Sequence, residues 1–208
     1  DEVTDKTQLD ASGLKILPGL VDIHSHGAVR HDFSDADVDG LRTILQYEKS
    51  HGITSYCPTS MTLPKEELLK IFQTAKDVEQ DETCARIVGI NMEGPFLDPV
   101  KKGAHVEGYI RKPDIEFFRA CNEAAGGMIK LVTLAPNMEG ADEFIEELTG
   151  ITNEMLSTAP NPIIVLRQLK DFLDDNILIG HNVNFDINFL YDNFTRYLSE
   201  PFTNDFVD

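Results

Sequence analysis

The chain has 208 residues, of which 41% are hydrophobic and 26% charged, enough for one ordinary hydrophobic core or two small ones. Its formal net charge of −18 opposes phosphate polyanions and membrane surfaces, so composition disfavours a general nucleic-acid binder and a membrane-associated protein. No apolar run has the length of a membrane span, and the first residues lack the apolar core of a secretory signal. We therefore expect a globular protein with a small-molecule partner.

The cysteines indicate a reducing environment. Cys57, Cys84 and Cys121 are odd in number, far apart and in no Cys-x-x-Cys spacing. This argues against both a disulfide framework and a zinc knuckle. Reduced thiols in the cytoplasm are the expectation.

From residue 14 to about 148, short apolar runs alternate with amphipathic stretches, which is typical of repeated strand and helix units around a parallel sheet. The pattern predicts four strands, at residues 20–23, 54–57, 86–91 and 129–134. It predicts helices at residues 38–50, 64–80, 113–125 and 142–148.

The pattern changes near residue 148, and residues 149–208 predict a helix-strand-helix unit. The apolar spacing in residues 161–173 fits one buried helix face, residues 176–183 fit a strand, and residues 186–198 fit a second helix. No linker separates the two parts. We expect two domains, residues 1–148 and residues 149–208.

Candidate metal ligands lie at the ends of two predicted strands. His24 and His26 are two residues apart, so both imidazoles fall on one face of an extended chain. Glu93 ends the third strand before a Gly-Pro turn, which places a carboxylate at the edge where barrel enzymes build their sites. A pair of polar residues at a strand end is the alternative for the histidines, and Glu93 favours the ligand interpretation.

Five separated motifs around these residues follow the order of one known family. They are LPGLVDIHSHG at 17–27, YCPTS at 56–60, EGPFL at 93–97, KKGAH at 101–105 and LAPNM at 134–138. Residues 10–148 thereby resemble N-acetylglucosamine-6-phosphate deacetylase, of the amidohydrolase superfamily. The resemblance implies an α/β fold, here a partial (β/α) barrel of about four units. It also implies an amino sugar phosphate as the small-molecule partner.

The resemblance assigns roles residue by residue. Glu93, His24 and His26 match metal ligands, and Ala104 with His105 matches the loop that closes over the sugar. In the family a divalent metal activates water for attack on the acetamide, and the metal here is zinc, iron, manganese or magnesium. Lys101, Lys102 and Arg111 offer positive charge for a phosphate or form a solvated basic turn.

The family's two later histidine ligands and its catalytic aspartate come from later strands, which this chain does not reach in family form. The catalytic residues are therefore unknown, and the active site is incomplete in this sequence. Four barrel units leave two open parallel edges, which would be covered by a second copy in a homo-oligomer or by the downstream segment.

Residues 147–208 carry a second resemblance. The motifs are LTGITNEML at 148–156, IGHNVNFDINFL at 179–190 and TNDFVD at 203–208, and they resemble a proofreading-type DEDD exonuclease of ribonuclease-H-like fold. Asp186 matches one of the four carboxylates that hold two metal ions, and His181 with Asn182 matches the residues that lead this motif. A single carboxylate cannot clamp two ions. Asp186 also suits the first turn of a helix.

Three functional hypotheses remain. The chain is a metal-dependent deacetylase whose missing ligands come from elsewhere, a fragment of a 3'-5' exonuclease acting on DNA, or a recombined or designed chimera without catalysis. The deacetylase hypothesis rests on the more specific motifs.

Overall fold

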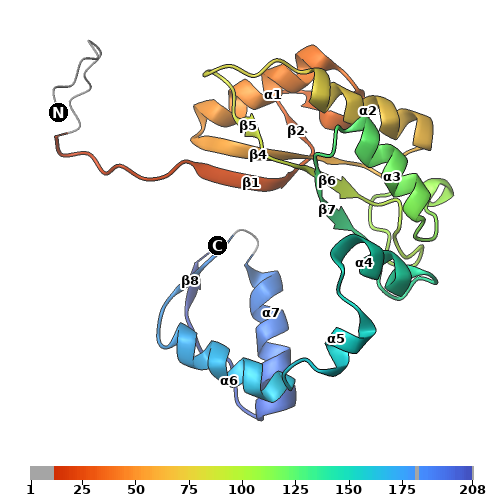
Figure 1. The fold of residues 1–208 in the computed structure, drawn as a ribbon. Helices are drawn as coiled ribbons and strands as arrows, with labels where there is room; N and C mark the ends of the chain where they lie inside the picture. Colours follow the sequence, from red (N-terminus) through yellow and green to blue (C-terminus); the bar gives the residue numbers. More distant parts are fainter. Residues whose placement is uncertain (1–11, 181–182, 208) are drawn as a thin grey trace, which may run out of the picture. The chain divides into compact units, whose positions relative to one another are not determined.

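The computed structural model describes residues 12–180 and 183–207 and divides the chain into two compact units, residues 1–150 and 151–208. The first unit is a mixed α/β fold with a mostly parallel sheet (Figure 1). Along the chain its strands are β1 (Leu20–Ser25), β2 (Gly27–Ala28), β3 (His31–Asp32), β4 (Ile53–Ser60), β5 (Arg86–Ile87), β6 (Ile90–Glu93) and β7 (Ile129–Thr133). Its α-helices are α1 (Val38–Ser50), α2 (Lys65–Asp77), α3 (Ile115–Ala124) and α4 (Ala141–Thr149).

The main sheet has the order β1-β4-β6-β7, all parallel, and β5 pairs with β4. β2 and β3, which lie between β1 and β4 in the sequence, form a separate short antiparallel pair. Among the described strands, β1 pairs only with β4 and β7 only with β6, so these two strands are the edges of the main sheet. All four carboxyl ends of the parallel path therefore lie at one edge of the sheet.

Capping residues define both ends of α1. The Asp37 side chain accepts a hydrogen bond from the amide of Asp39 at the start of α1, and Gly52 adopts a φ of 89° just beyond its end. The expectation of a helix at residues 38–50 is confirmed. α2 is shorter than expected, because Val78 is extended and the Gln80 side chain accepts a hydrogen bond from the Ile87 amide instead of continuing the helix.

The expected strand at residues 86–91 is two strands, β5 and β6, separated at Val88 and Gly89. A side chain at Gly89 would lie 2.8 Å from Cγ of Lys130, so the backbone runs close to β7 at the interruption. The other three expected strands are confirmed, and β1 and β4 extend further toward their carboxyl ends than the sequence indicated.

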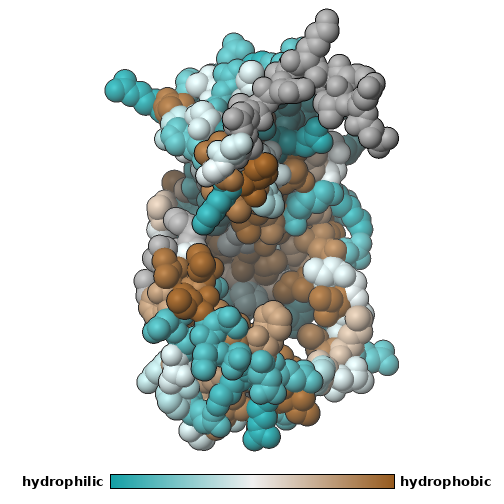
Figure 2. Space-filling model, turned by 90° about the vertical axis from the view of Figure 1, so that its left-hand side faces the viewer, coloured by the Kyte–Doolittle hydropathy of each residue, from teal (hydrophilic) through white to brown (hydrophobic). Residues whose placement is uncertain are grey.

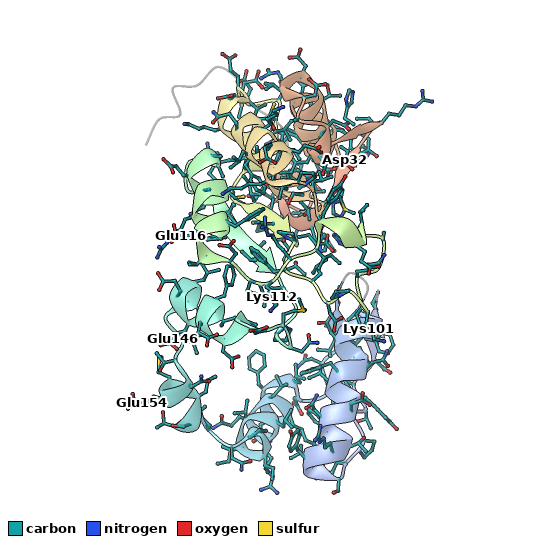
Figure 3. The ribbon with its side chains drawn as sticks, turned by 90° about the vertical axis from the view of Figure 1, so that its right-hand side faces the viewer. Asp32, Lys101, Lys112, Glu116, Glu146 and Glu154 are labelled. Carbon is teal, nitrogen blue, oxygen red and sulfur yellow. The ribbon has the colours of Figure 1, made fainter. Side chains whose placement is uncertain are left out.

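The core of the first unit is one cluster shared by the sheet and helices α1–α4. Its aromatic part brings Phe96 to a centroid distance of 4.9 Å from Phe144 and 5.8 Å from Phe117. Acidic side chains such as Glu116 on α3 and Glu146 on α4 project away from this core (Figure 3). These two acidic residues therefore lie on the outer faces of their helices.

The second unit contains α5 (Asn153–Ser157), α6 (Pro162–Leu173), β8 (Leu178–Ile179), α7 (Asn184–Asn193), a π-helical turn η3 (Phe194–Leu198) and β9 (Phe206–Val207). Its small core contains Leu166, Phe194 and Phe202. The expected strand at residues 176–183 was too long, since β8 ends at Ile179 and Val183 already precedes α7. The short α5, capped by the Thr152 side chain, and the strand β9 were not expected.

Hydrophobic side chains reach the surface in each unit (Figure 2). In the first unit they include Leu20, Val21 and Ile23 of the edge strand β1, and in the second Phe172, Ile179 and Phe189. Within the described part of the chain, no helix combines the length and the apolar character that a bilayer crossing requires.

Candidate metal centre

Three sequence-predicted residues converge at the carboxyl ends of β1 and β6. His24 lies near the end of β1, His26 directly follows this strand, and Glu93 is the last residue of β6. β4 lies between the two strands, so the three side chains meet across it. Parallel strands thus bring together residues that are 69 positions apart in the chain.

The three side chains present their donor atoms to one another. Nε2 of His24 and Nε2 of His26 each lie 3.1 Å from Oε2 of Glu93. Among the described residues, these three form the group of histidine, cysteine and acidic side chains whose ligand atoms lie within 4.8 Å of one another. His24 is exposed and the other two are half-buried, so the cluster is reached from solvent.

The chain geometry after β6 holds Glu93 in this place. Gly94 has a φ of 76°, and a side chain there would lie 2.1 Å from Oγ1 of Thr62. The Gly94 amide donates to the carbonyl oxygen of Thr133 at 3.2 Å, and the bond from Gly94 to Pro95 is cis. Glycine is required here both for its backbone conformation and for the close approach of Thr62.

A backbone carbonyl orients His26. Nδ1 of His26 lies 3.1 Å from the carbonyl oxygen of Thr59, which can only accept a hydrogen bond. Nδ1 therefore carries the proton, and in the neutral ring Nε2 keeps the lone pair that faces Glu93. A metal-binding histidine is typically held by a hydrogen bond of this kind from its second ring nitrogen.

His105 reaches the cluster from the loop after β6. It is 7% exposed, and its Nε2 lies 3.3 Å from Oε1 of Glu93. Its neighbour Ala104 is exposed. The family resemblance implied that both residues lie in a loop over a sugar, and the structure brings His105 into contact with a candidate metal ligand.

Contacts at the cluster lower the pKa of Glu93. Burial alone would raise this pKa, but hydrogen bonds from His105 and His24 and the electrostatic interaction with these two rings outweigh it. The pKa of Glu93 lies below the ordinary value of a glutamate, so the side chain is a carboxylate near neutral pH. An ionised carboxylate has only acceptor oxygens, as a metal ligand requires.

The donor set fits a divalent metal ion. Two ligands bound tetrahedrally at about 2.1 Å from an ion lie about 3.4 Å apart, close to the 3.1 Å separations of Oε2 from the two ring nitrogens. Two imidazoles and one carboxylate suit zinc or iron better than magnesium, which prefers oxygen ligands. Three protein ligands also leave a position for water, as catalytic zinc sites do.

Two of the basic residues near this loop have structural contacts of their own. Nζ of Lys102 donates to the carbonyl oxygen of His105 at 3.1 Å, and the Arg111 guanidinium lies 4.4 Å from the centre of the Phe117 ring. Lys101 is exposed in the loop after β6 (Figure 3). Lys102 and Arg111 thus help to hold the loop and its surroundings.

The nuclease residues give a different result. Asp186 is exposed in the first turn of α7, where the helix dipole accounts for it, and it belongs to no potential metal-binding group among the residues described. His181 and Asn182 lie outside the described residues.

Sequence reasoning missed the residues that orient the ligands. Thr59 contributes a carbonyl oxygen, and Thr62 contributes its amide to Nδ1 of His105 at 3.3 Å. Asn91 donates to the carbonyl oxygen of Ile23 at 3.1 Å. For Thr59 and Asn91 the signal in the sequence was a polar residue within a strand, which does not reveal its partner, and Thr62 lies just beyond the end of β4.

The chain is similar over about two thirds of its length to N-acetylglucosamine-6-phosphate deacetylases. The enzyme from Bos taurus is 33% identical over 149 residues, covering 69% of this chain and 36% of its own length. The enzyme from Bacillus subtilis is 34% identical over 137 residues, covering 64% of this chain and 35% of its own length. The chain thus spans about a third of the length of the curated relatives that it matches.

Solved structures agree. A mutant of N-acetyl-D-glucosamine-6-phosphate deacetylase from Mycobacterium smegmatis, in complex with N-acetyl-D-glucosamine-6-phosphate, superposes with a TM-score of 0.58 at 32% identity. It covers 64% of this chain and 34% of its own. The N-acetylglucosamine-6-phosphate deacetylase from Thermotoga maritima gives a TM-score of 0.54 at 29% identity and again covers 64% of this chain and 34% of its own.

The carboxyl-terminal part matches another family. The model of the exonuclease family RNase_T matches residues 122–208, fewer than half of the chain. This match begins within α3 of the first unit, earlier than the motifs at 148–156 indicated. Both expected resemblances, to the deacetylases and to an exonuclease, are therefore confirmed.

Proposed function

We propose that the first unit is the metal-binding part of a hydrolase that removes the acetyl group from an N-acetylated amino sugar phosphate. The convergence of His24, His26 and Glu93 at the carboxyl ends of parallel strands carries the proposal. The names of the relatives support the substrate class. The three free cysteines support a cytoplasmic setting.

In this proposal Nε2 of His24, Nε2 of His26 and Oε2 of Glu93 hold a divalent ion. Such an ion would polarise the amide carbonyl and supply a nucleophilic hydroxide at neutral pH. Thr59 would keep the His26 lone pair directed at the ion, and the loop with Ala104 and His105, which contacts Glu93 through His105, would lie beside the sugar. We assign no general base, so catalysis requires groups beyond this cluster.

We further propose that the four-strand path is part of a (β/α) barrel and that a second copy covers its edges. β1 and β7 each have one unpaired side among the described strands, and Leu20, Val21 and Ile23 are 53–64% exposed. Exposed apolar edge strands favour association with another chain. A homo-oligomer would bury these side chains and bring two clusters to one end of the assembly.

The match to the exonuclease family favours a second candidate function for residues 122–208. In it, Asp186 would be one of several carboxylates that bind metal ions for cleavage of DNA from its 3' end. A net charge of −18 opposes DNA binding, so this function ranks second. A chimera of two families without catalysis is the third candidate.

Acetate release from N-acetylglucosamine 6-phosphate tests the first candidate. Acetate release with zinc, iron or manganese present, abolished by Glu93→Gln and unchanged in Glu123→Gln, an exposed change on α3, would support the first candidate and show that the missing groups are supplied. Retained metal binding without any acetate release would overturn the catalytic part of the proposal.

Shortening of single-stranded DNA with manganese, abolished by Asp186→Ala, would establish the second candidate instead. A chain that unfolds cooperatively and is inactive in both assays would be the chimera without catalysis.

A further inference from the structure

The two oxygens of the Glu93 carboxylate have different partners. Oε2 lies 3.1 Å from Nε2 of both His24 and His26, and Oε1 lies 3.3 Å from Nε2 of His105. The carboxylate therefore offers one oxygen to the candidate ion and the other to His105. From this division we infer that His105 is a positioning residue, which holds Glu93 so that it binds the metal through Oε2 alone. This role is additional to the contact with the sugar that is expected of the loop.

The protonation of the His105 ring follows from its other partner. The Thr62 amide donates a hydrogen bond to Nδ1 at 3.3 Å, so Nδ1 carries a lone pair and no proton. The proton of the neutral ring is then on Nε2, which donates it to Oε1 of Glu93. Neither nitrogen has a free lone pair, so His105 acts on the ion through Glu93.

His105 is fixed on several sides. It is 7% exposed, its amide donates to the carbonyl oxygen of Lys102 at 3.2 Å, and Nζ of Lys102 donates to the His105 carbonyl oxygen at 3.1 Å. Thr62 contacts both partners, since its hydroxyl donates to the Glu93 carbonyl oxygen at 3.5 Å. The ring of His105 and the backbone of Glu93 are thus held by the same residue.

A hydrogen bond to the free oxygen of a ligating carboxylate prevents the carboxylate from rotating or binding through both oxygens. Loss of such a partner usually lowers metal affinity about 10- to 100-fold. The inference rests on the proposed metal site, and its failure can be separated from failure of that site.

The test is calorimetric titration of the folded, metal-free full chain with zinc alone. We expect His105→Leu, which fills the volume but has no donor, to weaken zinc binding about 10- to 100-fold. We expect His105→Gln, whose amide can donate to Oε1, to recover most of the affinity. His51→Leu removes an exposed histidine beyond α1 and is the matched control, with no change expected.

Each outcome of the zinc titration supports or overturns the inference about His105. Equal zinc affinity in wild type and His105→Leu overturns the inference, as does an equal loss in His105→Leu and His105→Gln. Complete loss of binding in His105→Leu, as large as in Glu93→Ala, would make His105 a ligand and also overturns it. Should His105→Leu not fold by circular dichroism, His105→Asn, which has a shorter reach than glutamine, replaces it in the comparison. A wild type that binds no zinc would instead refute the metal site itself.

Discussion

Asn91 donates a hydrogen bond from its side-chain amide to the carbonyl oxygen of Ile23 at 3.1 Å, across the strand β4 that lies between them. Ile23 directly precedes His24, and Asn91 lies two residues before Glu93 on the same face of β6. The bond therefore joins the two strands that carry the candidate ligands, and it fixes the peptide that precedes His24.

We expect Asn91→Ala to destabilise the first unit and weaken metal binding. Asn91 is 5% exposed, and the change removes a part-buried hydrogen bond whose net contribution to stability is about 1 kcal/mol. Urea unfolding followed by circular dichroism measures this loss, and zinc titration measures the affinity. Unchanged values in both measurements would show that the bond does not position His24.

The conformation at Gly94 gives a second prediction. Gly94→Ala introduces strain at a φ of 76° and a clash with Oγ1 of Thr62 at 2.1 Å. Gly103→Ala is the matched control, because Gly103 has a φ of 58° and no atom within 4 Å of the added carbon. Left-handed strain costs both variants about 1–2 kcal/mol, and only Gly94→Ala should also shift Thr62 and weaken metal binding. Equal effects of the two changes on unfolding and zinc affinity would contradict the packing described for Thr62.

The buried carboxyl group of Glu48 predicts a pH dependence of stability. Burial raises the pKa of Glu48, the negative charge of Asp22 raises it further, and His51 opposes this. The folded-state pKa thus lies above the unfolded value, so stability is highest below the unfolded pKa and falls as pH rises through the folded pKa. Glu48→Gln stays neutral and should gain stability relative to wild type over this interval.

Urea unfolding of wild type and Glu48→Gln between about pH 4 and pH 8 measures this difference, and Glu123→Gln controls for loss of a surface charge. A difference between wild type and Glu48→Gln that is the same at every pH would show that Glu48 has no raised pKa in the fold.

The burial of the cysteines predicts that their thiols react slowly with alkylating reagents in the folded protein. Burial raises the pKa of Cys121 to about 12, against smaller opposing effects of Lys65 and Arg111, and burial also raises the pKa of Cys57. All three cysteines are free and buried. We expect iodoacetamide at pH 8 to label them slowly in the native protein and rapidly in urea, as read by mass spectrometry. Fast native labelling of Cys121 would contradict its burial in the core.

The exposed edge strand predicts self-association. Val21→Asp places a charge among the apolar side chains of β1 and should shift the protein from oligomer to monomer in sedimentation velocity. Val100→Asp changes an equally apolar residue that is 84% exposed in a loop, and should leave the mass unchanged. A wild type that is monomeric at high concentration would refute pairing through β1.

Local signals in the sequence were sufficient for some features and not for others. Asp37 and Gly52 mark the start and the end of α1. The period of two predicted that His24 and His26 lie on one side of the first strand. The contact of Thr62 with His105 spans 43 positions and involves a backbone amide, which no local pattern reveals. The strand expected at residues 176–183 was wrong in length because apolar composition does not show where pairing with β9 ends. Tertiary contacts decide these features.

Zinc titration of the metal-free chain tests the account most directly. We expect about one ion per chain, bound tightly by wild type and by Glu123→Gln, and lost in Glu93→Gln, which removes the charge but keeps the shape of the side chain. No zinc binding by wild type, or equal binding by Glu93→Gln, would contradict the assignment of His24, His26 and Glu93 as a metal centre.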